Sequence, residues 1–245
     1  MSIIKVTVFQ KNINSDITRE QKVKLIAQKS DFLLFPEFFP NTTRISDKFI
    51  ADNEKFYLDK LLEVSEYYKG VIIGGSIIRK IKDKYYESCP IIKNVSVIEW
   101  YNKRTAGSIG NVNYSSGDGE LIFILSGIRF SILLGDDLKN EELIKKIKDE
   151  KISLVFNPSS LICPSESYLQ KYDQGLKESM ELSHKHLLNL IRTSGIGNLY
   201  GENLLALSLY ASNVGINWKI ATNENSTEII KTINVSLIGG ISPSN

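Results

Sequence analysis

The chain has 245 residues, 42% of them hydrophobic and 24% charged, a composition typical of a globular protein with a sizeable core. Its 30 basic and 28 acidic residues are spread along the chain, so no basic stripe predicts a nucleic-acid partner. No apolar run approaches the roughly 18 residues that cross a bilayer, and residues 1–10 alternate like a strand. We expect one domain over residues 1–245, in the cytoplasm and without a membrane segment.

The cysteines and histidines predict no metal chemistry. Cys89 and Cys163 lie far apart without a CxxC pattern, and His184 and His186 have no companions at ligand spacing. We therefore expect neither a disulfide framework nor a metal site, and no cofactor.

The first half of the chain alternates strands and helices. Ile3 to Phe9 and the apolar run Phe32 to Phe35 are predicted strands, joined by a helix over Thr18 to Lys29. A second helix over Lys55 to Lys69 leads into a strand over Val71 to Ile78. These repeated units predict an α/β protein with a parallel sheet.

Two hairpins follow, and the first predicts antiparallel strands added to that sheet. Cys89 to Val95 and Ser96 to Tyr101 meet in a tight turn, and Leu121 to Leu125 meets Ile128 to Leu134 at Ser-Gly.

The last part of the chain returns to alternation. We expect a helix over Glu141 to Asp149, a strand over Ile152 to Phe156 with a loop at Asn157 to Ser160, and a long amphipathic helix over Leu176 to Arg192. The expected closing strands are Leu204 to Ala211, Asn217 to Ala221 and Glu228 to Val235.

Polar groups follow three of the predicted strands. Glu37 comes just after Pro36, Lys103 lies beyond the second strand of the first hairpin, and Gly135 and Asp136 follow the second hairpin. In open α/β sheets, ligands bind at the carboxyl ends of strands. Each of these residues also has an interpretation without function: Glu37 as a loop glutamate, Lys103 as a solvated lysine, and Gly135 with Asp136 as a turn at the end of a strand.

The order and spacing of several segments resemble the nitrilase superfamily of carbon–nitrogen hydrolases over nearly the whole chain. The segments are VTVFQ, LLFPEFF, VIIGGS, the hairpin ending in YNK, YSSGDG, GIRFSILLGDDL and LVFNPSS. The resemblance implies a four-layer α-β-β-α sandwich, a homodimer paired across a subunit interface, and a site made of a glutamate, a lysine and a cysteine. Because the chain ends soon after Val235, the dimer mode stays open.

This chain matches two of the three site residues that the resemblance implies. Glu37 lies at the family's glutamate and Lys103 at its lysine, but Gly135 occupies the position of the nucleophilic cysteine. The resemblance also places Asn157 and Ser159 in the loop that borders the pocket.

Next to Gly135, Asp136 is a candidate substrate-binding residue, and Asp137 matches the aspartate that follows the family's cysteine. A second glutamate found in many relatives is expected to be absent, because its segment offers only Asn111 and Asn113.

In the mechanism that the resemblance implies, the glutamate takes the thiol proton, the thiolate attacks a carbonyl or nitrile carbon, and the lysine stabilises the developing charge. Gly135 has no side chain, so no acyl-enzyme forms there. Three explanations stay open: a pseudoenzyme that keeps its pocket, a relocated nucleophile at Asp136 or Cys163, or a cysteine removed by engineering. Cys163 and Asp136 also have interpretations in which neither is a nucleophile: Cys163 as a small buried residue and Asp136 as part of a solvated turn.

We therefore expect a catalytically impaired or diverged homologue that binds a small amide or acyl ligand in a Glu37/Lys103 pocket. The alternative is an active amidase, with a relocated nucleophile or with Glu37 as general base on water without a covalent intermediate. Ligand selectivity is expected to come from loops at Asn41 to Asp52 and Leu161 to Gly175.

Overall fold

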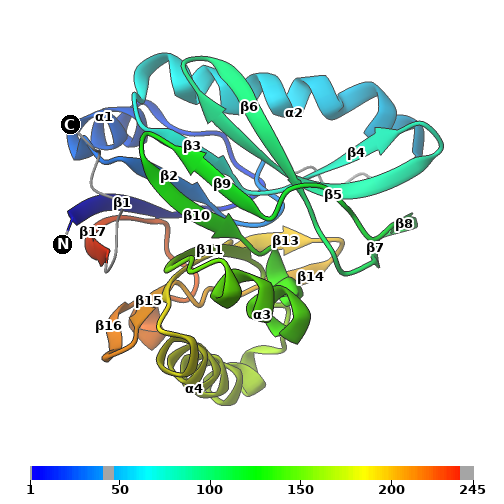
Figure 1. Cartoon of the computed structure of the whole chain (residues 1–245). Helices are drawn as coiled ribbons and strands as arrows, with labels where there is room; N and C mark the ends of the chain where they lie inside the picture. Colours follow the sequence, from blue (N-terminus) through cyan, green and yellow to red (C-terminus); the bar gives the residue numbers. More distant parts are fainter. Residues whose placement is uncertain (1, 41–46, 238–245) are drawn as a thin grey trace.

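In the computed structural model, which describes residues 2–40 and 47–237, two large β-sheets lie face to face between layers of helices (Figure 1). In the first sheet, β6 (Ser96–Asn102) pairs with β5, and the other strands follow the order β17 (Ile229–Leu237), β1 (Ser2–Gln10), β2 (Phe32–Phe35), β3 (Val71–Gly74), β5 (Lys84–Lys93) and β4 (Ile77–Ile81).

The second sheet follows the order β16 (Gly215–Lys219), β15 (Leu209–Ser212), β12 (Asn189–Ser194), β11 (Leu154–Ser159), β10 (Ile128–Ile132) and β9 (Ile122–Leu125). Two small hairpins stand apart from both sheets: β7 (Gly107–Ile109) with β8 (Val112–Tyr114), and β13 (Gly197–Leu199) with β14 (Glu202–Leu204).

Helices cover the outer faces. α1 (Arg19–Gln28) and α2 (Asp47–Tyr67) contact the first sheet, and α4 (Tyr168–His186) contacts the second, with α3 (Glu141–Asp149) beside it (Figure 1). The sandwich is therefore α-β-β-α, as the resemblance implied. None of the helices in the described ranges is long and apolar enough to cross a membrane.

Side-chain alternation in the strands builds separate cores. In β2, Phe32 and Leu34 point into the core between the sheets, whereas Leu33 and Phe35 point into the core under α1 and α2. Successive strand side chains point to opposite faces, so a four-residue apolar run serves both cores. A third core lies between the second sheet and α4.

The first β-α-β unit forms as predicted, and its helix has a clear start signal. Thr18 caps α1 by accepting a hydrogen bond from the Gln21 amide at 3.2 Å, while the Gln21 side chain accepts one from the Thr18 amide at 3.0 Å. This reciprocal capping box satisfies two amides that a helix start leaves unpaired.

The prediction of one long helix over Leu176 to Arg192 was wrong. α4 ends at His186, Leu187 adopts a left-handed conformation, and the chain turns into β12. β12 pairs with β11 in parallel and with β15 in antiparallel orientation. Its apolar residues fit a helix period as well as a buried strand, and strand pairing decided between the two.

Other boundaries also shifted. The predicted strand Val71 to Ile78 is two strands, and β11 continues to Ser159, so the expected loop at Asn157 is mostly strand. The loops predicted to select ligands are partly helical, because α2 begins at Asp47 and α4 at Tyr168. Residues 41–46 of the first loop lie outside the described ranges.

The closing strands also differ from the predicted bounds: they are β15, β16 and β17, and β13 and β14 form in the glycine-rich passage before them.

Candidate active site

The carboxyl ends of parallel strands from both sheets meet at one place. β2 is parallel to its neighbours β1 and β3, and Glu37 follows it; β10 and β11 are parallel in the facing sheet, and they lead to Gly135 and Ser159. Lys103 follows β6 at the same edge. The fold therefore gathers the polar residues that follow the predicted strands.

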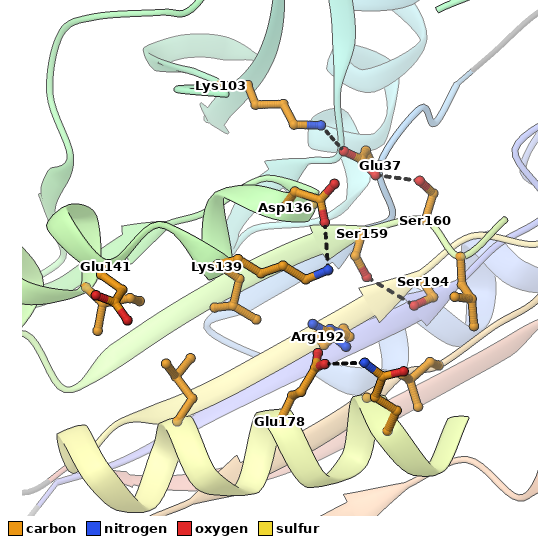
Figure 2. Close-up of a pocket in the computed structure, with 18 of the residues that line it drawn as sticks. Glu37, Lys103, Asp136, Lys139, Glu141, Ser159, Ser160, Glu178, Arg192 and Ser194 are labelled. Atoms are coloured by element: carbon orange, nitrogen blue, oxygen red, sulfur yellow. Dashed lines mark hydrogen bonds and ion pairs between the residues drawn. The ribbon is translucent and has the colours of Figure 1, made fainter. Parts of the chain in front are cut away.

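Glu37 and Lys103 form a buried ion pair, and a second carboxylate joins it. Lys103 Nζ lies 2.8 Å from Glu37 Oε1 and 2.9 Å from Glu87 Oε2. The exposed fractions are 2% for Glu37, 7% for Lys103 and 0% for Glu87, so solvent screens these charges little (Figure 2 shows the Glu37–Lys103 contact).

The sequence analysis missed Glu87, which lies outside the segment after Lys103 in which a second glutamate is expected to be absent. Glu87 comes from β5, before Lys103 in the chain, and accepts a hydrogen bond from Ser76 Oγ at 2.9 Å. Asn111 and Asn113 are exposed on the β7–β8 hairpin. The sequence does contain a signal for Glu87: it is a charged residue just before the apolar segment that begins at Cys89. It was missed because the strand was predicted to begin only at Cys89.

Burial and the neighbouring Glu37 carboxylate raise the pKa of Glu87 to about 8, against the opposing effect of Lys103. The protonated form of Glu87 is therefore favoured more than in an exposed glutamate. Burial opposes the ammonium form of Lys103, but Glu37 and Glu87 outweigh it and raise the pKa of Lys103.

Gly135 follows β10 and has a left-handed backbone with φ of +46°. A Cβ atom at this position would lie 2.5 Å from Glu37 Oε1. The Glu37 carboxylate therefore fills the space in which a side chain at position 135 would begin. A residue with a Cβ would move that carboxylate and would also adopt a backbone conformation that glycine tolerates best.

Ser160 is a second residue that the sequence analysis did not single out. Its Oγ donates to Glu37 Oε2 at 2.6 Å, and the residue is half-buried at the wall of the cavity (Figure 2). The predicted Ser159 also lines the cavity, but its hydroxyl pairs with Ser194 Oγ at 3.1 Å. The two adjacent serines therefore have different partners.

The two aspartates after Gly135 differ in burial and in their hydrogen-bond partners. Asp136 lines the cavity with a largely exposed side chain, 3.4 Å from Lys139 Nζ. Asp137 is fully buried, where it accepts hydrogen bonds from Tyr101 Oη at 2.6 Å and from the Thr105 amide at 2.8 Å. Through these hydrogen bonds, Asp137 at the end of β10 holds the segment that contains Lys103 in place.

Asn157 lies behind the cavity wall, fully buried. Its Nδ2 donates to the carbonyls of Leu133 at 2.6 Å and Gly135 at 3.2 Å, and its Oδ1 accepts from Arg192 Nε at 2.8 Å. Asn157 therefore positions the Gly135 backbone.

Cys163, one of the two alternative nucleophiles, is buried in the third core beside Tyr168 and is not among the cavity-lining residues. Burial also raises the pKa of its thiol, which disfavours the reactive thiolate.

The cavity above this cluster has a volume of about 1100 Å³. Glu37, Lys103, Gly135, Ser159 and Ser160 line it next to this cluster, and residues of α3, α4 and β12 form other parts of its wall (Figure 2). It is large enough for a small organic molecule, and charged side chains of α3, α4 and β12 line it in addition to Glu37 and Lys103.

Comparison with solved structures identifies the fold. The chain is similar to a carbon–nitrogen hydrolase from Helicobacter pylori G27 (TM-score 0.78, 15% identity, covering 96% of this chain and 90% of that chain). It is also similar to a variant of the amidase from Nesterenkonia sp. AN1 in complex with butyramide (TM-score 0.74, 13% identity, 95% and 90% covered).

A third similar structure is the glutamine-dependent NAD+ synthetase from Acinetobacter baumannii in complex with adenosine diphosphate (TM-score 0.73, 16% identity). The match covers 98% of this chain but 49% of that one, so this chain spans about half its length. No family model and no curated protein matches the sequence.

The protein therefore has the α-β-β-α fold of the nitrilase superfamily of carbon–nitrogen hydrolases. What it does with that fold depends on a site in which Glu37 and Lys103 are paired and Gly135 stands beside them.

Proposed function

We propose that this protein binds a small amide or acyl ligand in the cavity at Glu37 and Lys103, as a diverged member of the nitrilase superfamily without the cysteine-based reaction. The observation that carries the proposal is the buried Glu37–Lys103 pair at 2.8 Å beside Gly135. The carboxylate offers an acceptor for an amide N–H and the ammonium a donor for a carbonyl, but residue 135 supplies no nucleophile.

Isothermal titration calorimetry with butyramide tests this proposal. Glu37→Gln keeps the shape of the side chain and removes its charge, so affinity is expected to fall roughly 10- to 100-fold, as for loss of a hydrogen bond to a charged group. Glu202→Gln is the matched control and should keep the affinity, because Glu202 is an exposed glutamate on β14 that does not line the cavity. Equal affinity of Glu37→Gln and the unaltered protein would contradict the proposal.

The Ser160–Glu37 hydrogen bond favours a second candidate function, a slow amidase with a serine nucleophile. A hydroxyl 2.6 Å from a carboxylate has a general base within reach. In this reaction Ser160 Oγ would attack the amide carbon as its proton passes to Glu37. Ammonia would leave with that proton, and water would then hydrolyse the ester. A carboxylate is a weak base for a hydroxyl, so we rank this candidate second.

Ammonia release from a panel of primary amides distinguishes the two candidates. If the protein is a serine-dependent amidase, Ser160→Ala lowers turnover to background while Ser159→Ala retains it, because the Ser159 hydroxyl pairs with Ser194. Acid-quenched mass spectrometry should then find an acyl group on the peptide containing Ser160. Turnover that is unchanged in Ser160→Ala would exclude this candidate, and the absence of turnover would favour the binding function.

A further inference from the structure

Arg192 is a cation in the cavity that the proposed function leaves unused. It lies on β12 and is half-buried, and Figure 2 shows it above α4 among the cavity-lining residues. Its Nε donates to Asn157 Oδ1 at 2.8 Å. Within residues 2–40 and 47–237, no carboxylate forms an ion pair with it.

The carboxylates near Arg192 have other partners. Glu178, Asp136 and Glu37 favour the charged guanidinium, whereas burial lowers the pKa of Arg192. However, Glu178 accepts a hydrogen bond from Gln174 at 2.8 Å, Asp136 pairs with a lysine three residues further on, and Glu37 is held by the buried ammonium and by a serine. A partly desolvated guanidinium with one neutral partner retains donors for an anion.

The packing around Arg192 fixes its place at the wall of the cavity. Gly175 lies in the middle of α4, where a Cβ atom would be 2.3 Å from Leu207 Cδ2 and 3.5 Å from Arg192 Nη1. Glycine inside a helix costs about 1 kcal/mol relative to alanine, and here it permits the close approach of the helix to β12 and its neighbours.

Arg192 is also linked, through Asn157, to Gly135 beside the Glu37–Lys103 pair. Asn157 binds Arg192 through its Oδ1 and the Gly135 carbonyl through its Nδ2, at 2.8 and 3.2 Å. Arg192 Nε therefore lies within about 8 Å of that carbonyl oxygen, the sum of two hydrogen bonds and the width of an amide group. This spacing suits the two ends of one small molecule.

We propose that Arg192 binds a carboxylate of the ligand whose amide or acyl group lies at Glu37 and Lys103. This inference rests on the proposed function and names the ligand class: a short molecule with an amide or acyl group at one end and a carboxylate at the other. Arginine is suited to this role because its planar fork of N–H donors matches a carboxylate.

Three probes of similar size test the assignment by isothermal titration calorimetry. They are butyramide, succinamate, which has a carboxylate in place of the terminal methyl group of butyramide, and succinate. The unaltered protein is expected to bind succinamate roughly 10- to 100-fold more tightly than butyramide, as for one charge-assisted contact. Arg192→Gln should remove this preference and leave butyramide affinity within about twofold, and Arg192→Lys should retain part of it.

Arg129→Gln is the matched control, because Arg129 is a half-buried arginine on β10 of the same sheet and does not line the cavity. It should keep the full preference for succinamate. Circular dichroism and melting temperature confirm that each variant is folded before titration.

The outcomes separate the two proposals. Equal affinity for butyramide and succinamate, or a preference that survives in Arg192→Gln, overturns the carboxylate site, even if Glu37→Gln abolishes butyramide binding. If Glu37→Gln leaves all three affinities unchanged while Arg192→Gln weakens succinate and succinamate, the carboxylate site stands and the proposed amide site fails. If none of the probes binds, both proposals are wrong.

Discussion

Gly135→Cys is expected to give the protein a reactive thiol that forms an acyl adduct, whereas the unaltered chain forms none at this position. The new side chain would begin 2.5 Å from the present position of Glu37 Oε1, so the carboxylate would move and become the neighbour of the thiol. Lys103, 2.8 Å from the same oxygen, would then favour the thiolate and the oxyanion.

Intact-mass spectrometry after incubation with primary amides, activated esters and nitriles measures this effect, and peptide mapping locates the adduct. Mapping is needed because Cys89 and Cys163 are also present, both as buried free thiols. Since loss of a nucleophile costs roughly 10⁶ in turnover in a serine hydrolase, the difference between the two proteins should be all or none on the time scale of the assay.

Gly135→Ala is the control, because it adds the Cβ atom without the thiol. Both variants should lose about 1–2 kcal/mol of stability from the left-handed backbone, and Gly135→Ala should stay unmodified. Acylation at Cys163 in the unaltered protein would instead show a relocated nucleophile. A folded Gly135→Cys variant that reacts with none of the reagents would show that the site no longer supports cysteine chemistry.

Lys103→Met is expected to destabilise the protein by about 3–5 kcal/mol, the usual cost of removing one partner of a buried ion pair. The substitution leaves the Glu37 carboxylate, with an exposed fraction of 2%, without its cation. Urea unfolding at pH 7 measures the free energy of unfolding.

The control for this change is Lys84→Met, which removes an exposed lysine from the start of β5 and should change stability by less than about 0.5 kcal/mol. A double-mutant cycle adds Glu37→Gln to Lys103→Met: removing the carboxylate as well should recover part of the loss, because the remaining glutamine carries no charge. Equal stability of Lys103→Met and Lys84→Met would contradict a buried, energetically coupled pair.

Much of the fold followed from local pattern. The continuous apolar run Phe32 to Phe35 predicted a strand covered on both faces, and the structure buries alternate residues in two different cores. α3 has the predicted bounds, Glu141 to Asp149, because Asn140 accepts hydrogen bonds from the Glu142 and Leu143 amides and caps it. Elements with an unambiguous apolar pattern or a clear cap were therefore predictable.

Elements whose pattern fits two structures were not predictable. Leu188 to Ile191 suits a helix as well as a strand, and pairing with β11 and β15 made it the strand that carries Arg192. The start of β5 was also not predictable from local pattern. The strand begins five residues before the predicted start at Cys89, so Glu87 was not assigned to it. Pairing with distant strands is a tertiary property, and local propensity does not contain it.

The sequence by itself determined the alternation of strands and helices, the residues that follow the strands, and the identity of residue 135 as a glycine. It did so because side-chain period and chain-breaking residues act over a few positions. Tertiary packing placed Glu87 against Lys103, and it made Ser160 and Arg192 line one cavity with Glu37 and Lys103. The buried charges Glu37, Glu87 and Lys103 come from strands of the first sheet, which strand pairing brings together, whereas Ser160 and Arg192 come from the second sheet and reach the cavity because the two sheets pack face to face.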